Sequence, residues 1–310
     1  MNLTLAKRLL PAASLLLLTI FFAVKSPTFL TVENAFTLAN QYAYLLIIGI
    51  GATVVIVAGG IDLSVGSVLA LSGIAAAQVM VQRGWPVWAG CLCGVGVGAA
   101  IGLLNGLIVT RLRVPAFIAT LGTLLIARGL ALRIAKGVTI DGTPDGFNLL
   151  ASGRPFGLPA PLITIVLVAV LVAFLLNQTK FGRYVYAIGS NPEAARVSGI
   201  RTGQVTLLVY VLGGALAGLA GLIETARLGS GNPTGGSGYE LDVVTAVVVG
   251  GASLQGGEGR VSGTILGALL IAVLHNGSNL LGVDPFDQNI YIGILIIGAV
   301  AFDQFLRRMR

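Results

Sequence analysis

Long apolar runs separated by short polar segments fill the chain, and this pattern predicts a membrane protein with many spanning helices. A helix needs about 20 mainly apolar residues to cross the hydrocarbon core of a bilayer. We therefore predict an all-α polytopic fold of about ten transmembrane helices, in a single domain that covers residues 1–310. The runs lie at residues 9–24, 41–58, 64–82, 87–110, 114–134, 160–177, 203–226, 240–251, 261–281 and 288–306.

The composition agrees with a chain that lives in a lipid bilayer. Hydrophobic residues make up 55% and charged residues 10% of the 310 residues, and the mean hydropathy is +0.93. Soluble domains carry about 25% charged residues. The first run lacks a clear small-residue cleavage site and further spans follow it, so we expect a first transmembrane helix rather than a secretory signal.

Lys and Arg residues are divided unevenly between the two sides of the membrane. With ten spans both termini lie on one side, and alternating the loops places 12 of these residues on that side and 5 on the other. Cytoplasmic loops carry the excess of positive charge. We therefore expect both termini in the cytoplasm, and the net charge of +7 requires no nucleic-acid partner.

Glycines recur at intervals of four residues in three of the apolar runs. Such spacing forms a flat stripe on a helix, which lets two helix backbones approach closely where lipid removes the hydrophobic driving force. We expect these stripes to be helix contacts. They comprise Gly94, Gly98, Gly102 and Gly106, then Gly214 with Gly218, and Gly263 with Gly267.

A glycine pair interrupts the apolar pattern twice, in GGIDLS at residues 59–64 and in GGASLQ at residues 250–255, an offset of 191 residues. Transporters often contain repeated halves whose glycine-interrupted helices border the permeation path. We therefore expect two related halves, at about 40–135 and 203–306, and a translocation path beside the breaks. The break residues are Gly59, Gly60, Asp62, Ser64, Gly250, Gly251 and Ser253.

The carboxylate of Asp62 is costly inside a bilayer, so it needs a role there. The repeat places Asp62 on Ser253, and serine cannot supply negative charge. Both side chains accept hydrogen bonds from free backbone N–H groups at a helix start. We favour capping of the following helix by Asp62 or Ser64, while direct contact with a substrate or an ion stays open.

The longest polar cytoplasmic stretch, residues 178–203, contains SNPEAARVSG, which has the pattern of a short helix. Asn191 suits the N-cap, Pro192 the first helical position and Gly199 the C-terminal stop. Two turns are unstable alone in water, and the segment lacks a large apolar anchor for lipid. We expect this helix to dock on a cytoplasmic protein; its residues are Asn191, Pro192, Glu193, Ala194, Ala195, Arg196, Ser198 and Gly199.

Several long stretches resemble the permease subunits of bacterial ABC importers of the ribose type. They are GGIDLSVGSVLALSG, RVPAFIATLGTLLIARG, YAIGSNPEAARVSGI and GYELDVVTAVVVGGASLQGGEGRVSGTILGALL, and the resemblance extends over essentially the whole chain. It implies a fold of the ribose and vitamin-B12 importer kind, in the bacterial inner membrane, with two permease subunits paired, a homodimer being expected. It also implies a separate ATP-binding subunit, a periplasmic sugar-binding protein and a monosaccharide substrate, ribose being favoured. The family's coupling helix maps onto Asn191–Gly199.

The chain itself shows no sign of catalysis. It contains no G-x-x-x-x-G-K-[ST] phosphate loop and only one histidine, so we expect neither an enzyme nor a metal or cofactor in this chain. ATP and Mg²⁺ would belong to the partner ATPase. The Gly-rich segment at Gly229–Gly238 is expected to be a flexible external loop that meets the binding protein.

Three alternatives remain from the sequence. An ion-coupled secondary sugar transporter would need ionisable residues within spans, and the candidates are Asp62, Glu224, Asp242 and His275. Glu224 and Arg227 lie one turn apart, so we expect them to pair with each other. A passive channel would leave the docking helix unexplained. The same importer architecture could also carry another pentose, a hexose, a polyol or autoinducer-2.

Overall fold

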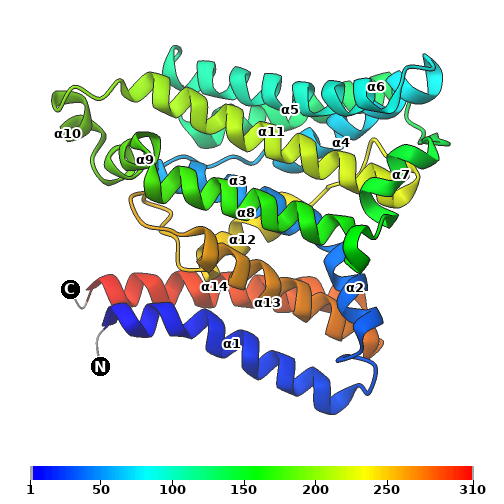
Figure 1. Cartoon of the computed structure of the whole chain (residues 1–310). Helices are drawn as coiled ribbons and strands as arrows, with labels where there is room; N and C mark the ends of the chain where they lie inside the picture. Colours follow the sequence, from blue (N-terminus) through cyan, green and yellow to red (C-terminus); the bar gives the residue numbers. More distant parts are fainter. Residues whose placement is uncertain (1–2, 309–310) are drawn as a thin grey trace.

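The computed structural model describes residues 3–308, without the side chains of residues 3–10, 295–296 and 299–308, and it is mostly helical. Figure 1 shows long helices that lie roughly alongside one another. Two-residue strands β1 (Ile140–Asp141) and β2 (Ser230–Gly231) pair antiparallel, and two short helical turns are η1 (Gln78–Gln82) and η2 (Pro155–Gly157). The α-helices are α1 (Leu3–Lys25), α2 (Val32–Gln41), α3 (Ala43–Val57), α4 (Val65–Ala77), α5 (Val87–Thr110), α6 (Ala116–Ala135), α7 (Asp145–Ser152), α8 (Ala160–Gln178), α9 (Lys180–Ser190), α10 (Pro192–Val197), α11 (Thr202–Leu228), α12 (Tyr239–Val249), α13 (Val261–Leu280) and α14 (Pro285–Arg308).

Every predicted apolar run overlaps one of these helices over most of its length. Within the described residues, six helical stretches are long and apolar enough to cross a membrane, and the pair α2 and α3, bent by 51°, makes a seventh if it is one span. Helix α12 has 11 residues, and at 1.5 Å per residue it is only about 16 Å long. The helical multi-span fold is confirmed, while the count of ten spans stays a prediction.

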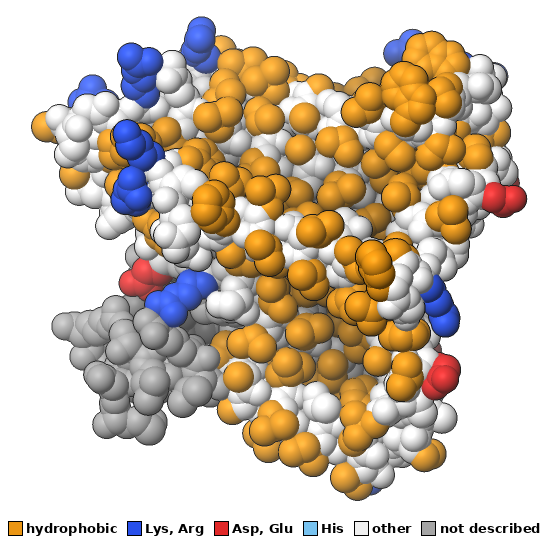
Figure 2. All heavy atoms as spheres, in the orientation of Figure 1, with side chains coloured by type: hydrophobic (Ala, Val, Ile, Leu, Met, Phe, Trp, Pro, Cys, Tyr) orange, Lys and Arg blue, Asp and Glu red, His pale blue; other side chains and the backbone are white. Residues whose placement is uncertain are grey.

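The two ends of the bundle differ in what they carry. Helix α10 lies at the same end as the first turn of α1 and the last turn of α14, whereas α2 and α7 lie at the opposite end (Figure 1). Figure 2 shows apolar side chains across the middle of one face and several Lys and Arg side chains at the α10 end. This is the arrangement of a bundle whose long axis crosses a bilayer.

Helix α11 lies in the interior of the bundle and packs against α3, α4 and α5. Its contact with α5 depends on glycine, because a side-chain carbon at Gly98 would collide with the backbones of Gly214 and Gly218. A side-chain carbon at Gly102 would collide with the backbone of Tyr210. The glycine stripes therefore set the distance between these two helices, and the packing of α3 and α4 around α11 follows from it.

The Gly-rich segment at residues 229–238, expected to be a flexible external loop, packs closely against α4 at Gly231 and Gly236, while Thr234 and Ser237 are exposed. Gly231 lies against Gly73 and Ala77 of α4, and Gly236 lies against Gly66 near the start of that helix. The segment thus follows α4 inward from its C-terminal end. The absence of a side chain at Gly231 and Gly236 is what permits this close fit, although glycine in the sequence suggests a mobile loop.

We predict that Gly98→Ala lowers the melting temperature of the detergent-solubilised protein, followed by circular dichroism. The added methyl group must push α5 and α11 apart, and overpacking of this kind costs about 1–3 kcal/mol of unfolding free energy. Gly96→Ala is the matched control, since Gly96 is exposed on the same helix and no neighbouring atom lies within 4 Å of the added carbon. Equal melting temperatures for the two variants would contradict the close approach.

Candidate functional site

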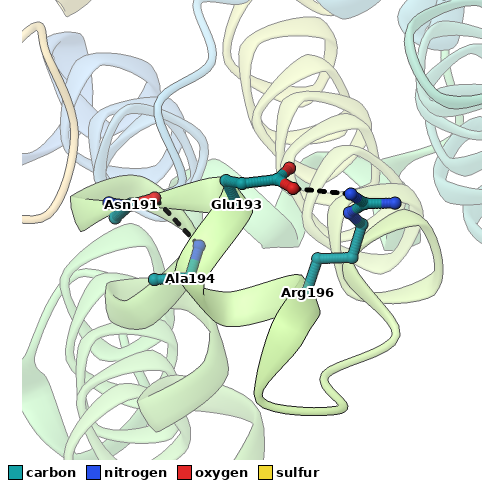
Figure 3. Close-up of polar contacts among 4 residues, drawn as sticks. All are labelled: Asn191, Glu193, Ala194 and Arg196. Atoms are coloured by element: carbon teal, nitrogen blue, oxygen red, sulfur yellow. Dashed lines mark hydrogen bonds and ion pairs between the residues drawn. The ribbon is translucent and has the colours of Figure 1, made fainter.

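The predicted docking helix is present as α10, which follows α9 after a single residue, Asn191. Figure 3 shows the Asn191 Oδ1 atom accepting a hydrogen bond from the Ala194 backbone N–H, at 2.9 Å, and Pro192 occupies the first turn. At the other end Ser198 is the C-cap and Gly199 has φ +82°. Asn at the N-cap, Pro inside the start and Gly past the end thus act as the sequence predicts.

The outer surface of α10 has no partner within the described chain. The Val197 side chain is 79% exposed, and Glu193 and Arg196 form an exposed ion pair one turn apart (Figure 3). The hydrogen bond from Arg196 lowers the pKa of Glu193, so both groups stay charged at neutral pH. Only Ala195 of this helix is buried. A helix of two turns that exposes valine and a fixed charge pair has the chemistry of a docking surface.

The first break lies between α3 and α4 and buries Asp62 at 5% exposure. The Asp62 Oδ1 atom accepts the Ser64 backbone N–H at 2.8 Å and the Ser64 hydroxyl at 2.6 Å. The Asn105 amide donates to the Ser64 hydroxyl oxygen at 3.0 Å, and the Thr123 hydroxyl donates to the Asn105 Oδ1 atom at 2.6 Å. One chain of hydrogen bonds thus joins the break to α5 and α6.

Capping at this break differs from the expectation in one respect. Ser64 is the N-cap of α4, but its side chain makes no capping bond with the helix; its hydroxyl donates to Asp62 and accepts from the Asn105 amide. Asp62 instead holds the backbone N–H of the N-cap residue. Asp62 therefore fixes the turn that leads into α4, through two hydrogen bonds that its Oδ1 atom accepts.

The second break forms a loop from Gly250 to Arg260 before α13 begins at Val261. The Ser253 hydroxyl oxygen accepts the Gln255 backbone N–H at 3.1 Å, which is the same two-residue spacing as Asp62 to Ser64. Ser253 therefore stabilises a turn within the loop rather than the start of α13. The longer loop here, with Gly251, Gly256 and Gly257 at positive φ, separates the turn from the helix.

The structure brings both breaks together beside α9. The Gly257 N–H donates to the Val57 carbonyl at 2.9 Å, and Gly256 lies against Gly59. Gly189 of α9 is so close to the Val57 carbonyl that no side chain would fit there. The Tyr186 hydroxyl, also on α9, donates to the Gly259 carbonyl at 2.8 Å.

A cleft of about 300 Å³ lies between α10 and the first break. Its wall includes Pro192, Gly59, Gly60, Thr206 and Tyr210. The Tyr210 hydroxyl is buried and has no hydrogen-bond partner among the described residues. Sequence reasoning missed Tyr186, Gly189 and Tyr210; their only sequence signal is that Tyr186 and Gly189 stand a few residues before the docking helix.

The candidates for ion coupling are engaged with other side chains. Glu224 forms the predicted pair with Arg227, through contacts of 2.7 and 3.0 Å. The His275 Nδ1 atom lies 2.8 Å from the Gln288 Oε1 atom, and its Nε2 atom lies 3.9 Å from Asp242. The Glu224 pair lies within α11, whereas the His275 contacts connect α13 with α14 and α12 as ordinary interhelical polar pairs.

Comparison with known proteins places the chain in a transport family. Residues 34–300 match the family described as branched-chain amino acid transport system / permease component. The ribose import permease protein RbsC of Bacillus subtilis (strain 168) is 45% identical over 96% of this chain and 93% of its own length. RbsC of Escherichia coli (strain K12) is 43% identical over 94% and 91%.

A relative with a different sugar in its name is also similar. The D-allose transport system permease protein AlsC of Escherichia coli (strain K12) is 37% identical over 94% of this chain and 90% of its own length. No solved structure matches. The chain therefore belongs to this family of transport-system permease components, and its similarity to the ribose-type permeases of ABC importers covers nearly its whole length.

Proposed function

We propose that this chain is the transmembrane subunit of an ATP-driven, binding-protein-dependent importer that carries a monosaccharide, ribose first, into the cytoplasm. The observation that carries the proposal is helix α10, a capped two-turn helix whose outer face has no partner in the described chain. Two relatives named for ribose import, 43% and 45% identical, support the substrate. The allose relative makes a hexose the second candidate.

The proposal assigns each partner to a surface. The ATP-binding subunit receives α10, a second copy of the chain completes the permease pair, and a periplasmic binding protein delivers the sugar at the end that carries α2 and α7. Both termini then lie in the cytoplasm, at the α10 end (Figure 1). Ten crossing segments follow if α1, α12 and α14 join the seven spans, with α12 completed by the non-helical segment before it.

ATP and Mg²⁺ belong to the separate subunit, and this chain supplies only the docking helix and the path. An ion-coupled carrier has no comparable support, because Glu224 pairs with Arg227 and His275 bonds to Gln288. Both glycine breaks border the path in our proposal. Their support is the cleft between α10 and Gly59–Gly60 and the contacts of α9 with both breaks.

We predict that Val197→Asp abolishes ATP-dependent ribose uptake by proteoliposomes that contain the permease, its ATPase subunit and its binding protein. A buried charge at an apolar docking point carries a large desolvation cost, so co-purification of the ATPase subunit should also fail. Because Val197 is 79% exposed, the melting temperature of the permease alone should not change. Val138→Asp, at a valine that is 65% exposed and distant from α10, should leave co-purification intact. Uptake that survives Val197→Asp and a scrambled 192–197 segment would refute the docking role.

We predict that Asp62→Asn retains most of the ribose uptake whereas Asp62→Leu loses it. The asparagine Oδ1 atom can accept the bonds from the Ser64 N–H and hydroxyl, while leucine leaves both buried donors unpaired at about 1–3 kcal/mol each. Uptake and the yield of folded protein should fall together in the leucine variant. Equal loss of uptake in both variants, with folded protein preserved, would show instead that the charge itself acts on the substrate.

A further inference from the structure

Arg128 is a cation well inside the apolar helix α6, twelve residues from its first and seven from its last residue. Its Nη1 atom donates to the Pro233 and Gly235 carbonyls, at 2.7 Å each. Among the described residues no acceptor pairs with its Nε or Nη2 atoms. The side chain is half-buried. Part of the guanidinium therefore holds the packed segment before α12, and the other edge keeps free N–H donors.

Glu240 is a carboxylate in the first turn of α12, on the other side of the same segment. It lies against Gly66 of α4, and its charge acts on Arg128. Within the described chain it makes neither a hydrogen bond nor an ion pair within 4 Å. The two opposite charges are thus neighbours that do not neutralise each other by contact.

Two hydroxyl side chains complete this surface. Thr234 and Ser237, in the segment between Arg128 and Glu240, are both exposed. We call the four residues Arg128, Thr234, Ser237 and Glu240 the polar face. It offers free donors, a free carboxylate and hydroxyl groups within one short stretch.

The polar face cannot be turned towards lipid. A charged side chain is costly at the centre of a bilayer, so such residues face a bundle interior or a water-filled cavity. Non-helical backbone at membrane depth, as in the turns at residues 232–238, is likewise tolerated only against protein or water. The polar face must therefore border either an aqueous passage or another protein surface.

We propose that the polar face is a contact site for the transported sugar in the wall of the passage, with Arg128 donating to neighbouring hydroxyl oxygens and Glu240 accepting hydroxyl protons; this rests on the proposed sugar import. A neutral polyol needs both donors and acceptors at once. The planar fork of arginine suits two adjacent oxygens, and a nearby carboxylate keeps the site close to neutral. A charged ligand would be attracted by one of the two side chains, Arg128 or Glu240, and repelled by the other, so the site favours an uncharged ligand.

The test uses proteoliposomes with the permease pair, its ATPase subunit and its binding protein, and measures ribose moved per ATP hydrolysed. Glu240→Gln keeps the side-chain shape and breaks no contact in the described structure; Arg128→Lys keeps the charge and removes the fork. Both should lower the ratio about ten-fold, the worth of a hydrogen bond to a charged group. Arg133→Gln, an exposed arginine near the end of the same helix, should leave the ratio unchanged.

The outcomes separate the inference from the function on which it rests. If the unsubstituted complex shows no ATP-dependent ribose uptake, the proposed function fails and the inference with it. If that uptake is normal and Glu240→Gln keeps the same ratio, only the inference is overturned. A parallel loss of uptake and hydrolysis in both variants would show a structural ion pair and would overturn it too.

Thiol labelling tests the aqueous setting without relying on transport. In a background with Cys91 and Cys93 replaced by alanine, Ser237→Cys should react with a hydrophilic thiol reagent, and ribose should slow the reaction. Val166→Cys, on the lipid-facing side of α8 at 53% exposure, should stay unlabelled. An unreactive Ser237→Cys variant would overturn the inference.

Discussion

Non-helical backbone inside a bilayer has N–H and C=O groups that make no helical hydrogen bonds, and the structure depends on how those groups find partners. In the first break, the Thr120 hydroxyl donates to the Ile61 carbonyl at 3.2 Å, and Asp62 takes the Ser64 N–H. In the segment before α12, Arg128 donates to the Pro233 and Gly235 carbonyls. Each side chain that makes these hydrogen bonds is polar and would be costly to expose to lipid.

Helix α6 is the common partner in these arrangements. Its polar side chains Thr120, Thr123 and Arg128 bond respectively to the first break, to Asn105 and to the segment before α12. The rest of its buried face consists of alanines: Ala119, Ala127, Ala131 and Ala135. Small residues let helix backbones approach closely, so α6 packs against α4 through these alanines, and its directional bonds go to α5 and to the two irregular segments. The first break and the segment before α12 are therefore both held in place by α6.

The sequence predicted what depends on local chemistry. The Asn191 cap, the Pro192 start and the Gly199 stop of α10 are each readable from a few neighbouring residues, and so is the pairing of Glu224 with Arg227. The packing of residues 229–238 could not be predicted, because a glycine-rich sequence is typical both of a mobile loop and of a segment that packs closely against a helix. The partners of Ser64 and Arg128 were hidden as well, since Asn105 and Pro233 lie far away in the chain and only the fold brings them close.

Helix α9 touches both glycine breaks and is joined to α10 through Asn191 alone. Because Gly189 leaves no space between α9 and the Val57 carbonyl, a movement of α9 cannot be absorbed at its contact with the first break. A push delivered at α10 would reach the end of α3 and the loop before α13 at the same time, so the two breaks would move together rather than one after the other. The two breaks would then move together because α9 and α10 move as one rigid unit, and no separate signal between the breaks would be needed.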